Sequence, residues 1–118
     1  MLSLGKHIVY LACGATDMRK QINGLASVVQ DSFRLSPFDD AAFVFCNRRR
    51  NRLKILMWDG DGFVLYFKRL ERGHFTWPTH NPDEQVLTLS SKELCDLLAS
   101  TNIIGKLKGN QVVERRVT

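Results

Sequence analysis

The sequence predicts a single α+β domain: an antiparallel β-meander sheet with one long amphipathic helix on one face and a short C-terminal helix. Three observations predict this fold class. Apolar and aromatic runs in residues 42–70 are separated by two turn signals, which is the pattern of a three-stranded meander. Residues 17–34 carry apolar side chains at three- and four-residue steps, the period of a helix. A length of 118 residues suffices for one hydrophobic core but not for two.

The N-terminal half begins with a short apolar run, residues 8–12, which we expect to be a strand. A turn then leads to the amphipathic helix, expected from Asp17 to Arg34. Thr16 is its expected N-cap, because its hydroxyl can accept a hydrogen bond from an otherwise unpaired backbone N–H. Asp17 suits the positive end of the helix dipole. With the meander and a last strand, the sheet should have about four to six strands.

The three meander strands differ in their patterns. Residues 42–46 are nearly all apolar, as expected of a central strand. In residues 53–58 and 63–68, one face of each strand is fully apolar and the other mixes apolar with basic side chains. We expect the apolar face to pack under the helix and the mixed face to be the working surface. The apolar positions are Leu53, Ile55 and Met57 in the second strand and Phe63, Leu65 and Phe67 in the third.

The C-terminal part contains three further expected elements. Residues 74–77 form a short extension closed by a proline, and residues 85–89 form a last strand. Ser90 or Ser91 then caps a short helix over residues 92–100, which has leucines on one face and a glutamate in its first turn.

The domain is expected to span residues 1–105, and residues 106–118 to form a basic, flexible tail. No apolar run approaches the about 20 residues that cross a bilayer. The N-terminus lacks the charged-then-apolar layout of a signal peptide. The expected location is therefore the cytoplasm.

The cysteine and histidine spacing predicts no metal site and no cofactor. Cys13, Cys46 and Cys95 are odd in number, far apart and without a Cys-x-x-Cys pair, so neither a disulfide framework nor a zinc site is indicated. The three histidines show no ligand spacing. Cys46 and Cys95 are interpreted as small core residues.

The positive charge is local. The whole chain has a formal net charge of +5. Residues 48–72 contain eight basic and three acidic residues, so this segment accounts for the entire excess. Clustered charge favours an acidic partner, nucleic acid first, over a basic surface that serves solubility alone. The candidate DNA-binding residues are Arg48, Arg49, Arg50, Arg52, Lys54, Lys68, Arg69 and Arg72.

The triple arginine of residues 48–50 is the main signal within this segment. Arginines at a hairpin tip can lie along a phosphate backbone or hold a base edge in a bidentate fashion. The alternative is a solvated turn that protects a strand edge from pairing. Nearby aromatic residues favour binding, because bases of single strands stack on aromatic rings, although tryptophans are more often core residues. These aromatics are Trp58, Tyr66, Phe75 and Trp77.

The segment from Asp59 to Gly62 admits two interpretations. Asp59 and Asp61 could bind Mg²⁺ in a nuclease, but no third carboxylate lies close in sequence. Asp-Gly is also a strong hairpin signal, and we favour a turn. The sequence contains no Ser/His/Asp or Cys/His arrangement, no phosphate-binding glycine loop and no HExxH motif. It therefore predicts no enzyme.

Several segments also carry a family resemblance: Thr16–Lys20, the run from Asn47 to Phe63, Lys68–Glu71 and Phe75–Pro78. Together they closely resemble the small TnpB-type accessory proteins, which the second open reading frame of bacterial insertion sequences of family sixty-six encodes. The resemblance runs in order from Tyr10 to Pro78 and more loosely to Gly105. It implies a role in transposition beside a separately encoded transposase that carries the catalysis. It supplies no established catalytic residues.

Two functional hypotheses follow. The first is a non-catalytic accessory protein of transposition that binds DNA, such as the transposon ends, through its basic hairpin and assists the transposase. The alternative is a protein–protein adaptor that recruits the transposase or a companion protein of the element without contacting DNA. In the adaptor, the expected partner-binding residues are Arg19, Lys20 and Trp77.

Overall fold

The computed structural model describes residue 5 and residues 7–99, which form a single α+β domain. The predicted tail, residues 106–118, lies outside the described residues. In chain order the elements are β1 (Ile8–Ala12), α1 (Ile22–Ser27), a π-helical turn (Val28–Ser32), β2 (Ala41–Cys46), β3 (Arg52–Trp58), β4 (Phe63–Arg69), β5 (Val86–Leu89) and α2 (Ser91–Ala99).

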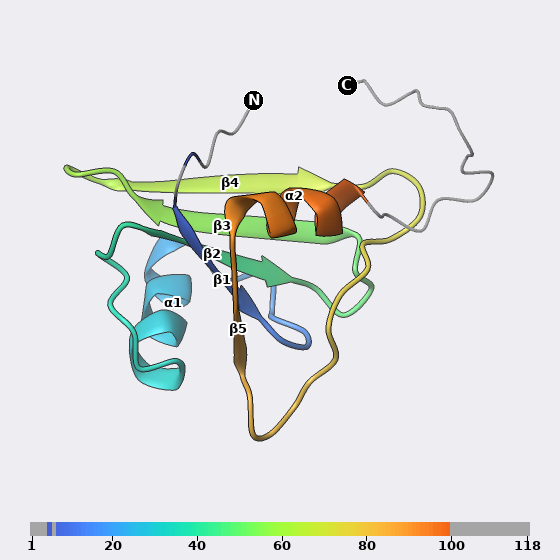
Figure 1. The fold of residues 1–118 in the computed structure, drawn as a ribbon, viewed down its shortest axis with the longest axis horizontal. Helices are drawn as coiled ribbons and strands as arrows, with labels where there is room; N and C mark the ends of the chain where they lie inside the picture. The colour runs from blue at the N-terminus through green and yellow to red at the C-terminus, as the bar shows by residue number, and fades with distance from the viewer. Residues whose placement is uncertain (1–4, 6, 100–118) are drawn as a thin grey trace.

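The described strands form one five-stranded sheet in the order β4-β3-β2-β1-β5 (Figure 1). The three-stranded meander predicted within residues 42–70 is confirmed, because β2, β3 and β4 are consecutive antiparallel neighbours, but the sheet as a whole is not a meander. The prediction of an entirely antiparallel sheet is wrong, since β1 pairs with β2 in parallel. Parallel neighbours need a crossover connection. The segment that contains α1 provides one, so the chain returns to start β2 in the same direction as β1.

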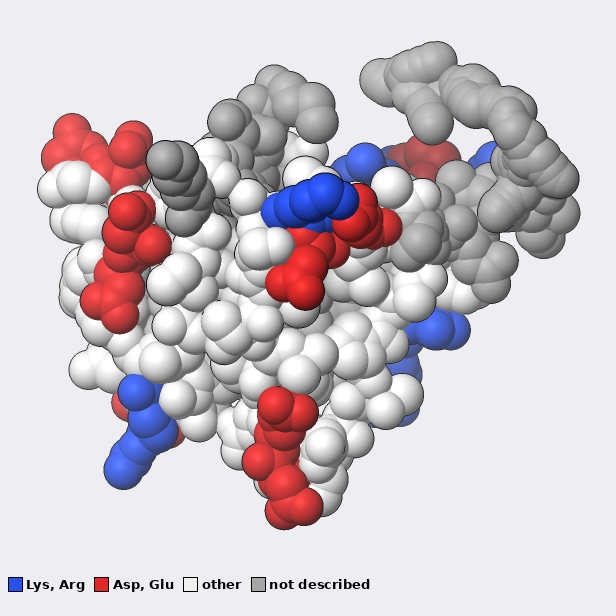
Figure 2. Space-filling view, in the orientation of Figure 1, with Lys and Arg blue, Asp and Glu red and all other residues white. Residues whose placement is uncertain are grey.

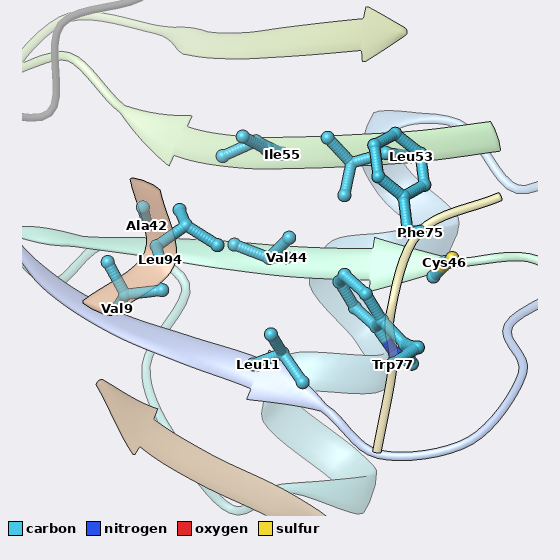
Figure 3. Packing of buried hydrophobic residues seen from close by; sticks show 10 residues of the cluster. All are labelled: Val9, Leu11, Ala42, Val44, Cys46, Leu53, Ile55, Phe75, Trp77 and Leu94. Carbon is cyan, nitrogen blue, oxygen red and sulfur yellow. The ribbon is translucent and has the colours of Figure 1, made fainter. Parts of the chain in front are cut away.

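Both faces of the sheet are covered. On one, here called the α1 face, Leu25 and Val29 of the helical segment pack with Phe43, Phe45 and Leu56 of the strands. The other, the α2 face, is covered by Leu94 of α2 and by the segment after β4 (Figure 3). The β2 strand is buried along its whole length, as predicted for a central strand.

The prediction that the apolar faces of both strands pack under the helix holds for Phe63 and Leu65 of β4 but is wrong for β3. In the register of β3 and β4, Lys54 lies opposite Phe67 and Leu56 lies opposite Leu65. The apolar positions of β4 therefore share the α1 face with the mixed positions of β3, while Leu53 and Ile55 of β3 lie in the α2-face core. Alternation defines two faces within each strand, but a one-residue change of register exchanges them.

The helix predicted from Asp17 to Arg34 begins later. The α-helix spans Ile22–Ser27 and continues as the π-helical turn Val28–Ser32. Gln21 is the N-cap residue and makes no capping hydrogen bond with its side chain, so the prediction of Thr16 as N-cap is wrong.

A long-range contact explains why the α-helix begins at Ile22 rather than at Asp17. The Lys54 Nζ donates hydrogen bonds to the backbone carbonyls of Met18 (2.9 Å) and Lys20 (2.8 Å). Those carbonyls would otherwise accept from N–H groups four residues later in a helix. The Asp17 carboxylate also closes a local turn by accepting from the backbone N–H of Arg19 (2.9 Å).

The C-terminal helix begins as predicted. The Ser90 Oγ accepts from the backbone N–H of Glu93 (3.1 Å), and the Glu93 carboxylate accepts from that of Ser90 (2.8 Å). This reciprocal pair is a capping box. Cys46 is buried as predicted, but Cys95 is exposed, because its neighbour Leu94 is the residue that α2 turns towards the sheet.

The extension predicted at residues 74–77 crosses the α2 face as irregular chain with one isolated bridge at His74. Phe75 and Trp77 are both buried. The Trp77 indole N–H donates to the carbonyl of Ala12 (2.9 Å), which ties this segment to the end of β1. Phe75 and Trp77 are therefore core residues, and together with α2 they cover the α2 face of the sheet.

Candidate nucleic-acid interface

The turns that carry the basic residues meet at one end of the sheet. Because β2, β3 and β4 are antiparallel, the β2–β3 turn and the end of β4 lie together. Two backbone hydrogen bonds join them: Leu70 N–H to the carbonyl of Asn51 (2.7 Å) and Phe75 N–H to the carbonyl of Arg50 (2.6 Å). We call this region the basic end; its basic residues are Arg48, Arg49, Arg50, Arg52, Lys68, Arg69 and Arg72.

The opposite end of the same strands is acidic. Asp59 and Asp61 lie in the β3–β4 turn, and Asp39 and Asp40 immediately precede β2; all four are exposed. In Figure 2, red carboxylates lie at the upper left, where β3 and β4 are joined, and blue side chains lie at the right, where β4 ends; one blue side chain also lies at the lower left, and a red one lies among the blue at the upper right. The domain is therefore polarised along its strands.

The β2–β3 turn is built by two asparagines. The Asn47 Oδ1 accepts from the backbone N–H groups of Asn51 (2.9 Å) and Arg52 (3.0 Å), and its Nδ2 donates to the Asn51 Oδ1 (2.8 Å). Arg50 adopts a left-handed backbone conformation with φ of 59°. This arrangement leaves residues 48–50 exposed at the tip.

The remaining basic residues extend the charge onto both faces. Arg52 and Arg69 lie opposite each other in the β3–β4 register and so share the α1 face. Lys68 lies opposite Leu53 and points to the α2 face. Arg69 is also held by an ion pair with Glu71 (2.8 Å). Positive charge therefore surrounds the end of the hairpin.

Two of the predicted binding residues are buried. Lys54 is 5% exposed, and its ammonium is engaged by the backbone carbonyls of residues 18 and 20. Trp77 is 7% exposed, with its indole N–H bound to a β1 carbonyl. Their polar groups act inside the domain rather than on the exposed basic surface.

The predicted partner-binding residues Arg19 and Lys20 lie beside the basic end. The Thr16 N–H donates to the carbonyl of Cys46 (2.8 Å), and the Lys54 contacts described above hold the segment that follows. This segment lines an open groove of about 770 Å³ together with β3 and β4. We call it the Phe67 groove; it is lined by Asp17, Met18, Arg19, Gln21, Asn47, Arg52, Lys54, Leu65 and Phe67.

Asp17 and Arg19 form a tight ion pair at the rim of this groove. The Arg19 side chain donates to both carboxylate oxygens of Asp17, at 2.8 Å for its shortest contact. These hydrogen bonds, with a further one from the Arg19 backbone, lower the pKa of Asp17 to about 2. The Arg19 side chain is 92% exposed, so its guanidinium remains accessible to a ligand.

Phe67 is the site residue that sequence reasoning missed. It was expected in the core, but it is 50% exposed and lies on the groove. Among the aromatics that were singled out, Trp58 packs instead against Phe38 and Phe63, with ring centroids 5.1 and 5.0 Å away. Only the register that places Lys54 opposite Phe67 would have drawn attention to it.

The predicted turn between β3 and β4 is confirmed. The Asp59 N–H donates to the carbonyl of Gly62 (2.7 Å), and Gly60 adopts a positive φ of 74° that suits glycine. Within the part of the chain that the structure describes, no three His, Cys, Asp or Glu side chains are grouped to hold a metal ion. In the same residues, neither helix is long and apolar enough to cross a membrane.

Fold and site together define a small α+β domain with a strongly basic sheet end. The chain belongs to the IS66 Orf2-like family, since the family described as "IS66 Orf2 like protein" matches residues 7–106. This match confirms the resemblance seen in the sequence. It makes the protein an accessory protein of an insertion sequence, associated with elements that carry an IS66 transposase.

Two relatives come from Sinorhizobium fredii (strain NBRC 101917 / NGR234). The chain is 39% identical over 100 residues to the uncharacterized protein y4hO, covering 84% of this chain and 85% of the relative. It is 36% identical over 70 residues to the uncharacterized protein y4jC, covering 59% and 60% respectively. No solved structure matches the chain.

Proposed function

We propose that this protein is a non-catalytic accessory protein of transposition that binds DNA through its basic end and assists a separately encoded transposase. The observation that carries the proposal is the separation of charge along the sheet. Seven Lys and Arg residues gather at one end of the described domain, while four aspartates lie at the other. A polyanion is attracted to the first end and repelled by the second, so DNA would approach in one orientation.

The arrangement of the basic end suits phosphate contacts. Residues 48–50 project from a turn that the Asn47 and Asn51 side chains lock, so the arginines are presented on a fixed backbone. Arg52 and Arg69 on one face and Lys68 on the other can reach phosphates on either side of the tip. Lys54 and Trp77 are not part of the proposed interface, because both are buried.

Charge reversal at the turn tests the proposal. The variant R48E/R49E/R50E should lose DNA binding in a fluorescence-anisotropy titration with duplex and single-stranded oligonucleotides. Its thermal stability should stay close to that of the wild type, because the three side chains are exposed. Wild-type affinity should fall linearly with salt on logarithmic axes, since each phosphate contact releases counterions.

A pair of single variants provides the matched control. Arg49→Glu and Lys92→Glu change the net charge equally, but Lys92 lies on α2, where it pairs with Asp96. Only Arg49→Glu should weaken DNA binding and reduce the salt slope by about 1. Equal effects of the two variants would indicate attraction to net charge rather than a defined interface.

The adaptor hypothesis makes the opposite prediction. If the wild-type protein binds no DNA at low salt, the basic end serves an acidic protein surface, and Arg19 and Lys20 lie beside the site where it would bind. Co-purification with the transposase that resists nuclease treatment would then be expected. The transposase complex should dissociate in the same R48E/R49E/R50E variant.

A further inference from the structure

Phe67 is exposed in a place where an apolar ring is not expected. Single exposed apolar side chains are common on protein surfaces. Phe67, however, lies on the edge strand β4, opposite Lys54 and two residues from Arg69 on the same face. Half of its surface is accessible. The Lys54 ammonium lies over the ring, 5.9 Å from its centroid, so one face of the ring makes a cation–π contact within the domain.

The groove beside Phe67 combines an apolar surface with cations at its rim. Met18, Leu65 and Phe67 supply the apolar part, and Arg19 and Arg52 are among the charged residues that line the groove. The groove is open to solvent, which suits a nucleotide whose strand continues beyond it. A planar base with its phosphate matches this chemistry, because aromatic rings stack on bases and guanidinium groups bind phosphates.

We propose that the Phe67 groove binds an unpaired nucleotide of single-stranded DNA, with its base stacked on Phe67 and its flanking phosphates near Arg52 and Arg19. This inference rests on the proposed function and deepens it by naming the form of DNA that the domain recognises. In a duplex, base faces are covered by neighbouring base pairs, so a ring can stack only where a base is unpaired or flipped out. The arginine turn contacts phosphates of either form, whereas the groove distinguishes them.

The Phe67 groove and the arginine turn should differ in the form of DNA that they bind. Residues 48–50 lie at the hairpin tip, and Phe67 lies within β4 on the α1 face. Removal of the ring should therefore affect the binding of unpaired strands alone. Removal of the arginines should affect all DNA.

The test compares full-length wild type with Phe67→Ala and Phe67→Leu. Affinities are measured by fluorescence anisotropy for three probes: a single-stranded oligonucleotide, a blunt duplex, and the same duplex with a single-stranded overhang. Phe67→Ala should bind the single strand and the overhang about 5- to 100-fold more weakly, the loss typical of one stacked base. Its affinity for the blunt duplex should stay within about twofold of wild type.

Val64→Ala is the matched control. Val64 is 40% exposed on the same strand but lies opposite Met57, on the α2 face. It should leave all three affinities unchanged. Phe67→Leu keeps an apolar side chain without the ring, so a loss in this variant as well assigns the effect to stacking. A single strand with 2-aminopurine should also show a change in fluorescence on binding to wild type that is absent in Phe67→Leu.

The outcomes separate the two proposals. If wild type binds DNA but neither Phe67 variant weakens single-strand binding, the groove does not hold a base and the inference is overturned, while the basic end stands. If wild type binds no DNA of any form at low salt, the proposed function fails and the inference with it. If Phe67 instead contacts a protein, Phe67→Ala should lose transposase binding and keep DNA binding, which would also overturn the inference.

Discussion

At the scale of single residues, the ion pair of Asp17 and Arg19 sets the charge at the rim of the groove. Among the described residues, Asp17 is the one acidic side chain that lines the groove, where an unpaired carboxylate would oppose phosphate binding. Arg19 offsets it with side-chain and backbone hydrogen bonds, which hold the pKa of Asp17 at about 2. The pair also fixes the turn that precedes α1.

Asp17 should therefore titrate well below the usual range. A carboxyl group whose pKa is lowered on folding stabilises the folded state above its unfolded pKa. That contribution is lost as the pH falls towards the folded value. Stabilisation by Asp17 should thus be complete above about pH 4 and disappear between its unfolded pKa of 3.8 and about 2. An NMR titration of the carboxyl carbon measures this pKa directly.

Two variants check the cause of the shift. Arg19→Ala removes the side-chain hydrogen bonds and should move the pKa of Asp17 back towards 3.8. Lys92→Ala, which removes a different exposed ion pair, should leave the pKa of Asp17 unchanged. A pKa near 4 for Asp17 in the wild-type protein would show that the ion pair does not persist in solution.

At the scale of elements, Lys54 of β3 sets the start of α1 from a distance. Its side chain crosses to residues 18 and 20, which are more than thirty positions away in the sequence. The sequence pattern of residues 17–34 is helical throughout, so local reasoning places the first turn at Asp17. The pattern does not reveal a competing donor, which explains why the strands were predicted more closely than the helix.

Lys54→Met tests this role. Methionine keeps the apolar stem but leaves two carbonyls without their charged donor, which should lower the free energy of unfolding by about 1–3 kcal/mol. Urea denaturation measures this loss, and hydrogen exchange should become faster in residues 17–22. The control is Lys68→Met, an exposed position on the same hairpin, which should change stability by less than about 0.5 kcal/mol. Equal effects of the two substitutions would rule out the anchoring role.

The strands illustrate what alternation can and cannot predict. The bounds of β1, β2 and β4 follow closely from apolar runs and turn signals. The pairing of β1 with β2 does not, because the direction of β2 depends on how the intervening helix crosses the sheet. Which side chains of β3 and β4 share a face depends on the register of the two strands, and no local pattern specifies that register.

At the scale of the whole molecule, folding sorts charges that the sequence interleaves. Asp59 and Asp61 lie between the two basic runs along the chain. Because β3 and β4 are seven residues each, their turn lies about 20 Å from the basic end. The cluster of positive charge was predictable from the positions of the basic residues in the sequence. The separation of Asp59 and Asp61 from the basic residues could not be predicted without the three-dimensional structure. The same holds for the burial of Lys54 and the exposure of Phe67.

The most direct test of the basic end as a DNA-binding surface is an NMR titration of the isotope-labelled full-length protein with a short DNA duplex that carries a single-stranded overhang. The largest amide shift changes should fall in residues 47–52 and 68–72, with further changes around Arg19 and Phe67. The β3–β4 turn, which carries Asp59 and Asp61, should stay unchanged. Changes confined to that acidic turn, or none at low salt, would contradict the assignment of the basic end.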